Sequence, residues 1–213
     1  MLVYLSLGSN IGNRLKNIQT AIKLLKEIGF DIIKASSLYE TSPWPVRRDK
    51  PARQMGSLTG GSLNGLKIKT EQPDFLNLVL KGKTKFSPEE LLQEIKQIEK
   101  TMGREKTEKW GPRIIDIDIL FYEKKFVNTR LLQPSRSPHQ RRRRLTSNGL
   151  QIPHPQLHKR AFVLIPLKEI APNLVHPVLK KTVSQMLNDL PARQAGGDDK
   201  GSVVLYNKLK EIC

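Results

Sequence analysis

The chain has 213 residues with an ordinary apolar content of 38%, so a folded globular protein large enough to bury a core is expected. No apolar run approaches the roughly 20 residues of a membrane-spanning helix, and the start MLVYLSLGSN lacks the layout of a secretory signal. The single cysteine, Cys213, excludes an internal disulfide, and together these features predict a cytoplasmic protein with no membrane partner.

The net charge of +17 is high and points first to a polyanionic partner such as nucleic acid. The excess is unevenly placed, however. Residues 45–72 carry six basic against two acidic residues, and residues 131–149 carry five arginines and no acid, so these segments hold about half of it. Salt-sensitive nucleic-acid binding through them is one hypothesis. For the arginine run at 141–144 a solvated charged loop is the preferred interpretation.

The first half of the chain predicts a strand, a helix and a second strand before a long loop. Residues 3–7 form a short apolar strand that ends in a turn composition. From Asn13, apolar residues recur at helical spacing until Gly29 interrupts the pattern. Residues 30–39 are predicted as a strand. Residues 45–72 are rich in glycine, serine and basic residues without periodicity, which indicates a loop.

The second half begins with an extended segment at residues 75–84. Ser87 can cap a helix, Pro88 suits its first position and Glu90 can complete a capping box, so a helix is expected from here to Gly103. The remaining predicted elements are a strand at 114–121, short helices at 160–171 and 182–190, and a late strand at 203–206.

The order β-α-β-β-α-β predicts an α+β sandwich with helices on one face of a mostly antiparallel sheet, the ferredoxin-like layout. We expect a single domain over residues 1–190, interrupted by insertions at about 45–72 and 131–150, and a C-terminal tail at 191–213. A monomer is the expected state.

Two carboxylates lie in the strand predicted at 114–121. Asp116 and Asp118 are two residues apart and so share one face, while the isoleucines between them point into the core. Carboxylate oxygens on a rigid strand suit Mg²⁺, which completes its shell with waters and substrate phosphates. The alternative is an exposed polar face paired to nearby cations. Cations at Arg104, Lys106 and Arg113 just upstream favour a metal-bound triphosphate.

The residues around these acids resemble a known family. Residues 109–120 are similar to the hallmark Arg-Trp-Gly-Pro-Arg-x-x-Asp-x-Asp-Ile-Leu of the 6-hydroxymethyl-7,8-dihydropterin pyrophosphokinases, with Lys109 in place of the first arginine. There is no Gly-x-x-x-x-Gly-Lys loop in the chain, so ATP would be held by side-chain cations and metal. Further segments that resemble the family are 6–12, 36–43, 74–77, 152–155 and 160–167.

The resemblance implies transfer of the pyrophosphoryl group of ATP to 6-hydroxymethyl-7,8-dihydropterin, with release of AMP, in folate synthesis. It implies two Mg²⁺ ions held by Asp116 and Asp118, which would act in catalysis with Arg104 and Arg113. It also implies an ATP site of Lys96, Glu99, Arg104, Lys106, Trp110, Arg113, Ile119, His154 and Arg160. The implied pterin site consists of Thr41, Ser42, Pro43, Trp44, Phe75, Asn77 and Phe162.

Taken without the resemblance, several of these residues have simpler interpretations. Phe75 and Phe162 would be core residues, His154 an exposed loop residue, and Glu99 half of a solvated ion pair. A relative that keeps the fold and has lost catalysis is a further alternative. Retention of the acids and arginines named above argues against it.

Overall fold

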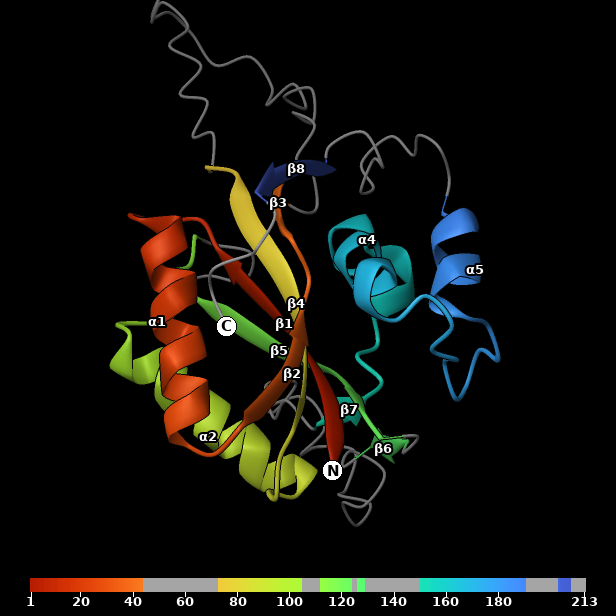
Figure 1. Cartoon of the computed structure of the whole chain (residues 1–213), viewed down its shortest axis with the longest axis horizontal. Coiled ribbons are helices and arrows are strands. Elements are labelled where there is room, and N and C mark those ends of the chain that lie inside the picture. The colour runs from red at the N-terminus through yellow and green to blue at the C-terminus, as the bar shows by residue number, and fades with distance from the viewer. Residues whose placement is uncertain (44–72, 105–111, 124–125, 129–149, 191–202, 208–213) are drawn as a thin grey trace, which may run out of the picture.

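A six-stranded antiparallel sheet forms the centre of the molecule (Figure 1). The computed structural model describes residues 1–43, 73–104, 112–123, 126–128, 150–190 and 203–207. Strand order is β5-β1-β4-β3-β8, and β2 pairs with the other end of β4. A separate two-stranded sheet joins β6 to β7. The strands are β1 Leu2–Ser9, β2 Asp31–Ala35, β3 Leu38–Thr41, β4 Phe75–Lys83, β5 Asp116–Tyr122, β6 Val127–Asn128, β7 Gln151–Ile152 and β8 Val203–Asn207.

The two long helices begin where the sequence predicts them. Helix α1 spans Arg14–Glu27 after the cap residue Asn13, whose side chain accepts a hydrogen bond from the Lys16 N–H at 3.0 Å. Helix α2 spans Pro88–Thr101. Ser87 and Glu90 form the predicted capping box, since each side chain accepts the other residue's backbone N–H. Both helix predictions are confirmed.

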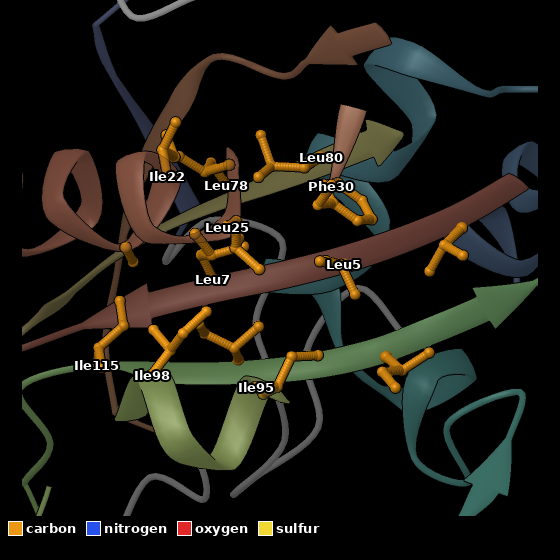
Figure 2. Close-up of a cluster of buried hydrophobic side chains, with 14 of the residues drawn as sticks. Leu5, Leu7, Ile22, Leu25, Phe30, Leu78, Leu80, Ile95, Ile98 and Ile115 are labelled. Carbon is orange, nitrogen blue, oxygen red and sulfur yellow. The ribbon is translucent and has the colours of Figure 1, made fainter. Parts of the chain in front are cut away.

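Alternate residues of the central strands face two different cores. Leu5 and Leu7 of β1 belong, with Leu78 and Leu80 of β4, to the cluster that packs against α1 and α2 (Figure 2). The predicted inward direction of Ile115, Ile117 and Ile119 is confirmed, because all three are buried in this cluster. Because side chains alternate between the two faces of a strand, one face of the sheet packs against α1 and α2.

The opposite sheet face is covered as well. Tyr4, Val79 and Phe121 pack against α4, which spans Ala161–Ile170, and α5, which spans Val183–Asn188. Figure 1 shows these two helices on the opposite side of the sheet from α1 and α2. Both short helices were predicted, and the α+β class is confirmed. The expectation that helices cover a single face is wrong, because the helices after residue 160 bury the second face of the same sheet.

The single strand predicted at 30–39 is also wrong, since β2 and β3 are separate strands on either side of Ser36 and Ser37. Ser36 is fully buried, and its Oγ accepts the backbone N–H of Val79 in β4 at 2.9 Å. A side-chain oxygen thus takes the place of the backbone carbonyl that would accept this N–H in a continuous strand pair. Glu169 of α4 accepts hydrogen bonds from the Ser37 N–H, the Ser37 hydroxyl and the Tyr39 hydroxyl at 2.9 to 3.0 Å. The interruption thus anchors α4 to the sheet.

The late strand predicted near the C-terminus is confirmed as β8, which pairs with β3 and so joins the sheet. The predicted domain boundary at residue 190 stays a prediction, and most residues of both predicted insertions lie outside the described ranges. Within the described residues, no helix combines the length and the apolar character that crossing a membrane requires.

Loss of the Glu169 charge should weaken the anchor of α4. Burial, together with the hydrogen bond to Glu169 and its negative charge, raises the pKa of Tyr39 to about 12. The Glu169→Gln variant should lower this pKa, as read from phenolate absorbance with Tyr39→Phe as the reference, and should reduce the unfolding free energy by about 1 kcal/mol. In the wild type, the raised pKa contributes stability below pH 10 that is lost as the pH rises through about 12.

The matched control is Glu27→Gln, because Glu27 makes only an exposed pair with Lys23 at 3.8 Å. An unchanged Tyr39 pKa in Glu169→Gln would contradict the described hydrogen bond.

Candidate functional site

The end of β1 lies between the starts of two other strands. Gly8 is opposite Asn77 of β4 on one side and opposite Asp116 of β5 on the other. A Cβ at Gly8 would lie 2.6 Å from Asn77 Oδ1 and 3.6 Å from the ring of Phe75. Any larger residue at position 8 would therefore force the Asn77 side chain to shift.

The predicted pterin residues gather on this side of the sheet. Asn77 is buried and donates a hydrogen bond from Nδ2 to Thr41 Oγ1 at 2.6 Å. Phe75, next to Gly8, is half-buried, so the alternative of a core residue is not met. Ser42 and Pro43 follow directly after β3 and are half-buried. Trp44 lies outside the described residues.

Asp116 is held by two guanidinium groups. Arg104 Nη1 lies 2.8 Å from Asp116 Oδ1, and Arg113 Nη1 lies 2.6 Å from Asp116 Oδ2. Burial raises the pKa of Asp116, but the positive charges of Arg113, Arg104 and Lys96 outweigh burial and hold this pKa below its ordinary value. Asp116 is therefore a carboxylate throughout the neutral range.

Glu99 of α2 lies beneath this pair and reaches the edge of the sheet. Its side chain is 2% exposed, so the alternative of a solvated ion pair is wrong. Oε1 contacts Arg104 and accepts the N–H of Ile117 at 2.9 Å, while Oε2 contacts Lys96 Nζ at 2.8 Å. Burial raises the pKa of Glu99, and the charges of Lys96 and Arg104 oppose this effect. Glu99 thus orients Arg104 toward Asp116.

Asp118 is the more open carboxylate of the two, with 36% of its side chain exposed. Its Oδ2 lies 3.9 Å from Arg160 Nη1 and 4.0 Å from His154 Nε2. Burial lowers the pKa of His154, although the charge of Asp118 acts in the opposite direction. Nδ1 of His154 accepts the N–H of Gln156 at 3.3 Å, so the proton of the neutral ring lies on Nε2.

His154 and the start of α4 bring a second set of predicted residues to the acids. The backbone N–H of His154 donates to the Leu120 carbonyl of β5 at 3.1 Å, and its side chain is 20% exposed, so the alternative of a fully exposed loop residue is not met. The Arg160 guanidinium lies 5.6 Å from the centre of the Phe162 ring. Phe162 packs against the buried residues of α4 and α5 but is itself only half-buried, so it is not a fully buried core residue.

The two acids suit a hard divalent cation in one respect. Both present carboxylate oxygens from the same face of one strand, which is the donor type that Mg²⁺ prefers. In the described part of the chain, no group of three or more His, Cys, Asp or Glu side chains could enclose a metal ion. The donor set therefore fits an ion that takes most of its ligands from water and substrate.

Some predicted site residues are not brought to this cluster. Lys106 and Trp110 lie outside the described residues, as does the basic run for which nucleic-acid binding was considered. The Ile119 side chain is 5% exposed and belongs to the core facing α1 and α2. Only its backbone remains for contact with ATP, and that contact stays a prediction.

Two residues of the site were missed by the sequence analysis as functional positions. Gly8 separates Asn77 from Asp116, and Asn10 is a buried residue that bonds the segments before β4 and β5. The available signal was positional. Gly8 lies near the end of the first strand and Asn10 directly follows that strand, in a turn composition, and the sheet order then places this turn beside the acids.

Comparisons with known proteins show which family the chain belongs to. The family model described as 7,8-dihydro-6-hydroxymethylpterin-pyrophosphokinase (HPPK) matches residues 4–172. An Aquifex aeolicus 2-amino-4-hydroxy-6-hydroxymethyldihydropteridine pyrophosphokinase is 38% identical over 183 residues, which is 86% of this chain and 88% of the relative. The folic acid synthesis protein fol1 of Pneumocystis carinii is 39% identical over 83% of this chain, and the match spans only 18% of that longer protein.

Solved structures show the same fold. A wild-type Plasmodium falciparum HPPK-DHPS crystal structure matches 88% of this chain and 44% of its own chain, with a TM-score of 0.60 at 22% identity. At that identity the likeness shows the fold alone. The family match and the near full-length relative go further, and the chain belongs to the 7,8-dihydro-6-hydroxymethylpterin-pyrophosphokinase family of folate-synthesis enzymes.

Proposed function

We propose that this chain transfers the pyrophosphoryl group of ATP to the hydroxymethyl group of 6-hydroxymethyl-7,8-dihydropterin. The substrate hydroxyl oxygen forms a bond to the β-phosphorus and gives up its proton to water, the bond from that phosphorus to the α–β bridging oxygen breaks, and AMP leaves. The observation that carries the proposal is the pairing of Asp116 with both Arg104 and Arg113, beside the more open Asp118.

The charges around the acids fit a polyphosphate. Lys96, Arg104, Arg113 and Arg160 supply four cations against the carboxylates of Glu99, Asp116 and Asp118, and the lowered pKa of His154 keeps its ring neutral at neutral pH. An incoming triphosphate brings the negative charge that this set lacks. Positioned cations stabilise charge that develops on a transferring group, and they need little reorganisation at the moment of reaction.

Asp116 and Asp118 would hold Mg²⁺, which would supply positive charge against the phosphates of ATP. Two such ions are proposed. The residues of this chain then have separate tasks. Arg104 and Arg113 exchange part of their contact with Asp116 for phosphate oxygens, Glu99 holds Arg104 in place, and the His154 Nε2–H faces the acid side of the site.

The pterin would lie on the neighbouring part of the sheet. A flat bicyclic ring is bound by aromatic faces and a few fixed hydrogen-bonding groups. Phe75 and Phe162 are both half-buried and can present ring faces. Asn77 and Thr41, joined by their 2.6 Å hydrogen bond, supply fixed polar groups in a buried position. Thr41 to Trp44 would contact the amide-like edge of the ring.

The reaction is tested by following AMP release from ATP, Mg²⁺ and 6-hydroxymethyl-7,8-dihydropterin. The wild type should release AMP only when the pterin is present. Asp116→Asn should lower kcat by about 100-fold or more, because the variant loses a metal ligand and the negative charge that pairs with both guanidiniums.

The matched control is Asp189→Asn, which removes an exposed carboxylate paired to Lys181 at 2.8 Å and far from β5 in sequence. Equal activity of the two variants, or folded wild-type protein that releases no AMP, would overturn the proposed function.

A metal requirement gives an independent measurement. Chelation should abolish AMP release, and added Mg²⁺ should restore it. Asp118→Asn should raise the Mg²⁺ concentration for half-maximal rate by about tenfold, which corresponds to ~1.4 kcal/mol. A Mg²⁺ dependence identical to that of the wild type would show that Asp118 does not hold the metal.

Gly8 should control the pterin side of the site. In Gly8→Ala, the new Cβ would meet Asn77 Oδ1 at 2.6 Å, so Asn77 must move and its bond to Thr41 is disturbed. We expect kcat/KM for the pterin to fall by about tenfold or more, with a smaller change in KM for ATP.

A double-mutant cycle supplies the control for Gly8. Because Asn77→Ala removes the atom that the new Cβ would meet, Gly8→Ala should cost little more in that background. Additive losses in the cycle would rule out a contact with Asn77 as the cause.

A further inference from the structure

Asn10 lies at the junction of the two halves of the site. It directly follows β1, and its side chain is 1% exposed. Because β1 runs antiparallel to both neighbours, its last residues lie beside the first residues of β4 and β5. Those starts carry Phe75 and Asn77 on one side and Asp116 on the other.

Asn10 bonds the backbone just before each of these strands. Its backbone N–H donates to the Arg113 carbonyl at 3.1 Å, and its Oδ1 accepts the Arg113 N–H at 2.7 Å. Both backbone polar groups of Arg113 are therefore held by one residue. Asn10 Nδ2 donates to the Pro73 carbonyl at 3.1 Å, two residues before Phe75. A buried amide with donors and acceptors in use fixes the direction of all the groups it touches.

The turn that carries Asn10 is itself braced. Asn17 of α1 donates through Nδ2 to Ser9 Oγ at 3.1 Å and to the Ile11 carbonyl at 2.8 Å. Arg14 donates to the Asp74 carbonyl at 2.7 Å and pairs with Glu40 at 2.7 Å. The start of α1 thus holds the turn from behind, and Asn10 is the described residue that bonds both flanking segments.

We propose that Asn10 is a positioning residue that sets the Arg113 guanidinium against Asp116 and fixes, through Pro73, the start of the strand that carries the pterin-binding side chains. This inference rests on the proposed function. Asn10 uses both polar atoms of its side chain on backbone groups. It acts by holding the Arg113 backbone, from which the 2.6 Å contact to Asp116 follows. Displacement of a phosphate-binding group by about 1 Å can reduce the rate by ~100-fold.

Asn10→Ala removes both side-chain bonds, and Asn17→Ala is its matched control. Asn17 also makes two hydrogen bonds in the same turn, but it contacts neither Arg113 nor Pro73 in the described structure. Asn10→Ala should lower kcat by about 10- to 100-fold and raise KM for ATP, whereas Asn17→Ala should keep both within about twofold at the same loss of thermal stability. Equal losses in the two variants would overturn the proposal, since they would show a general effect of the turn.

A double-mutant cycle tests whether Asn10 acts through Arg113. In an Arg113→Ala background, the guanidinium is already gone, so Asn10→Ala should lower kcat by less than about twofold further. A full additional loss in that background would sink the proposed route.

Asn10→Asp keeps the acceptor for the Arg113 N–H and replaces the donor to the Pro73 carbonyl, with almost no change in shape. It should raise KM for the pterin more than KM for ATP. A larger effect on ATP would contradict the separate tasks of Oδ1 and Nδ2.

Hydrogen exchange separates this inference from the proposed function. The Arg113 amide should exchange faster in Asn10→Ala and stay protected in Asn17→Ala, whatever reaction the protein catalyses. If the wild-type protein releases no AMP, the proposed function is wrong, but the hydrogen-exchange result for the Arg113 amide still holds. If the Arg113 amide is equally protected from exchange in Asn10→Ala and in the wild type, Asn10 does not position Arg113, whatever the reaction of the protein.

Discussion

The antiparallel register of β1 between β4 and β5 is the constraint on which the site depends. It sets Gly8 opposite Asn77 and Asp116 at once, so residues about 40 positions apart in the chain meet at one end of the sheet. A slip of one residue would turn every side chain of β1 to the other face. Because Leu5 and Leu7 are fully buried under the first two helices, the core excludes such a slip. Apolar packing thus determines where the polar site forms.

Electrostatics then explains how the site holds its partly buried charges. A buried or half-buried carboxylate is costly unless partners compensate for lost hydration. Asp116 has Arg104 and Arg113 as partners, whose guanidinium nitrogens lie 2.8 and 2.6 Å from its carboxylate oxygens. Within the described residues, Asp118 contacts cationic side chains at 3.9 and 4.0 Å and is more exposed than Asp116, so it is the acid with more capacity left for a cation. The two acids differ in environment, although the sequence pattern treats them alike.

Sequence alone predicted the features that arise from local rules. The cap at Ser87 depends on a bond to a residue three positions away, and the alternation around Asp116 depends on strand geometry. The break at Ser36 and Ser37 could not be predicted in this way, because Glu169 lies 132 residues from Ser37. The Arg113 N–H bond to Asn10 spans 103 residues and leaves no periodic trace. The second helical layer was missed for the same reason, since a short apolar helix does not reveal which sheet face it covers.

Glu99 shows how closely the site and the fold are connected. It projects from α2, on the face opposite to the acids, and reaches round β5, which is the edge strand of the main sheet. An edge strand has backbone groups without a strand partner, and Glu99 accepts one of them, the Ile117 N–H. The same oxygen contacts Arg104, which contacts Asp116. Removal of one member leaves a buried charge without compensation, which costs about 3–5 kcal/mol in other proteins. For any variant of Glu99, Arg104 or Asp116, the loss of activity therefore has to be compared with the loss of stability. Only a loss of activity that exceeds the effect of unfolding shows a role in catalysis.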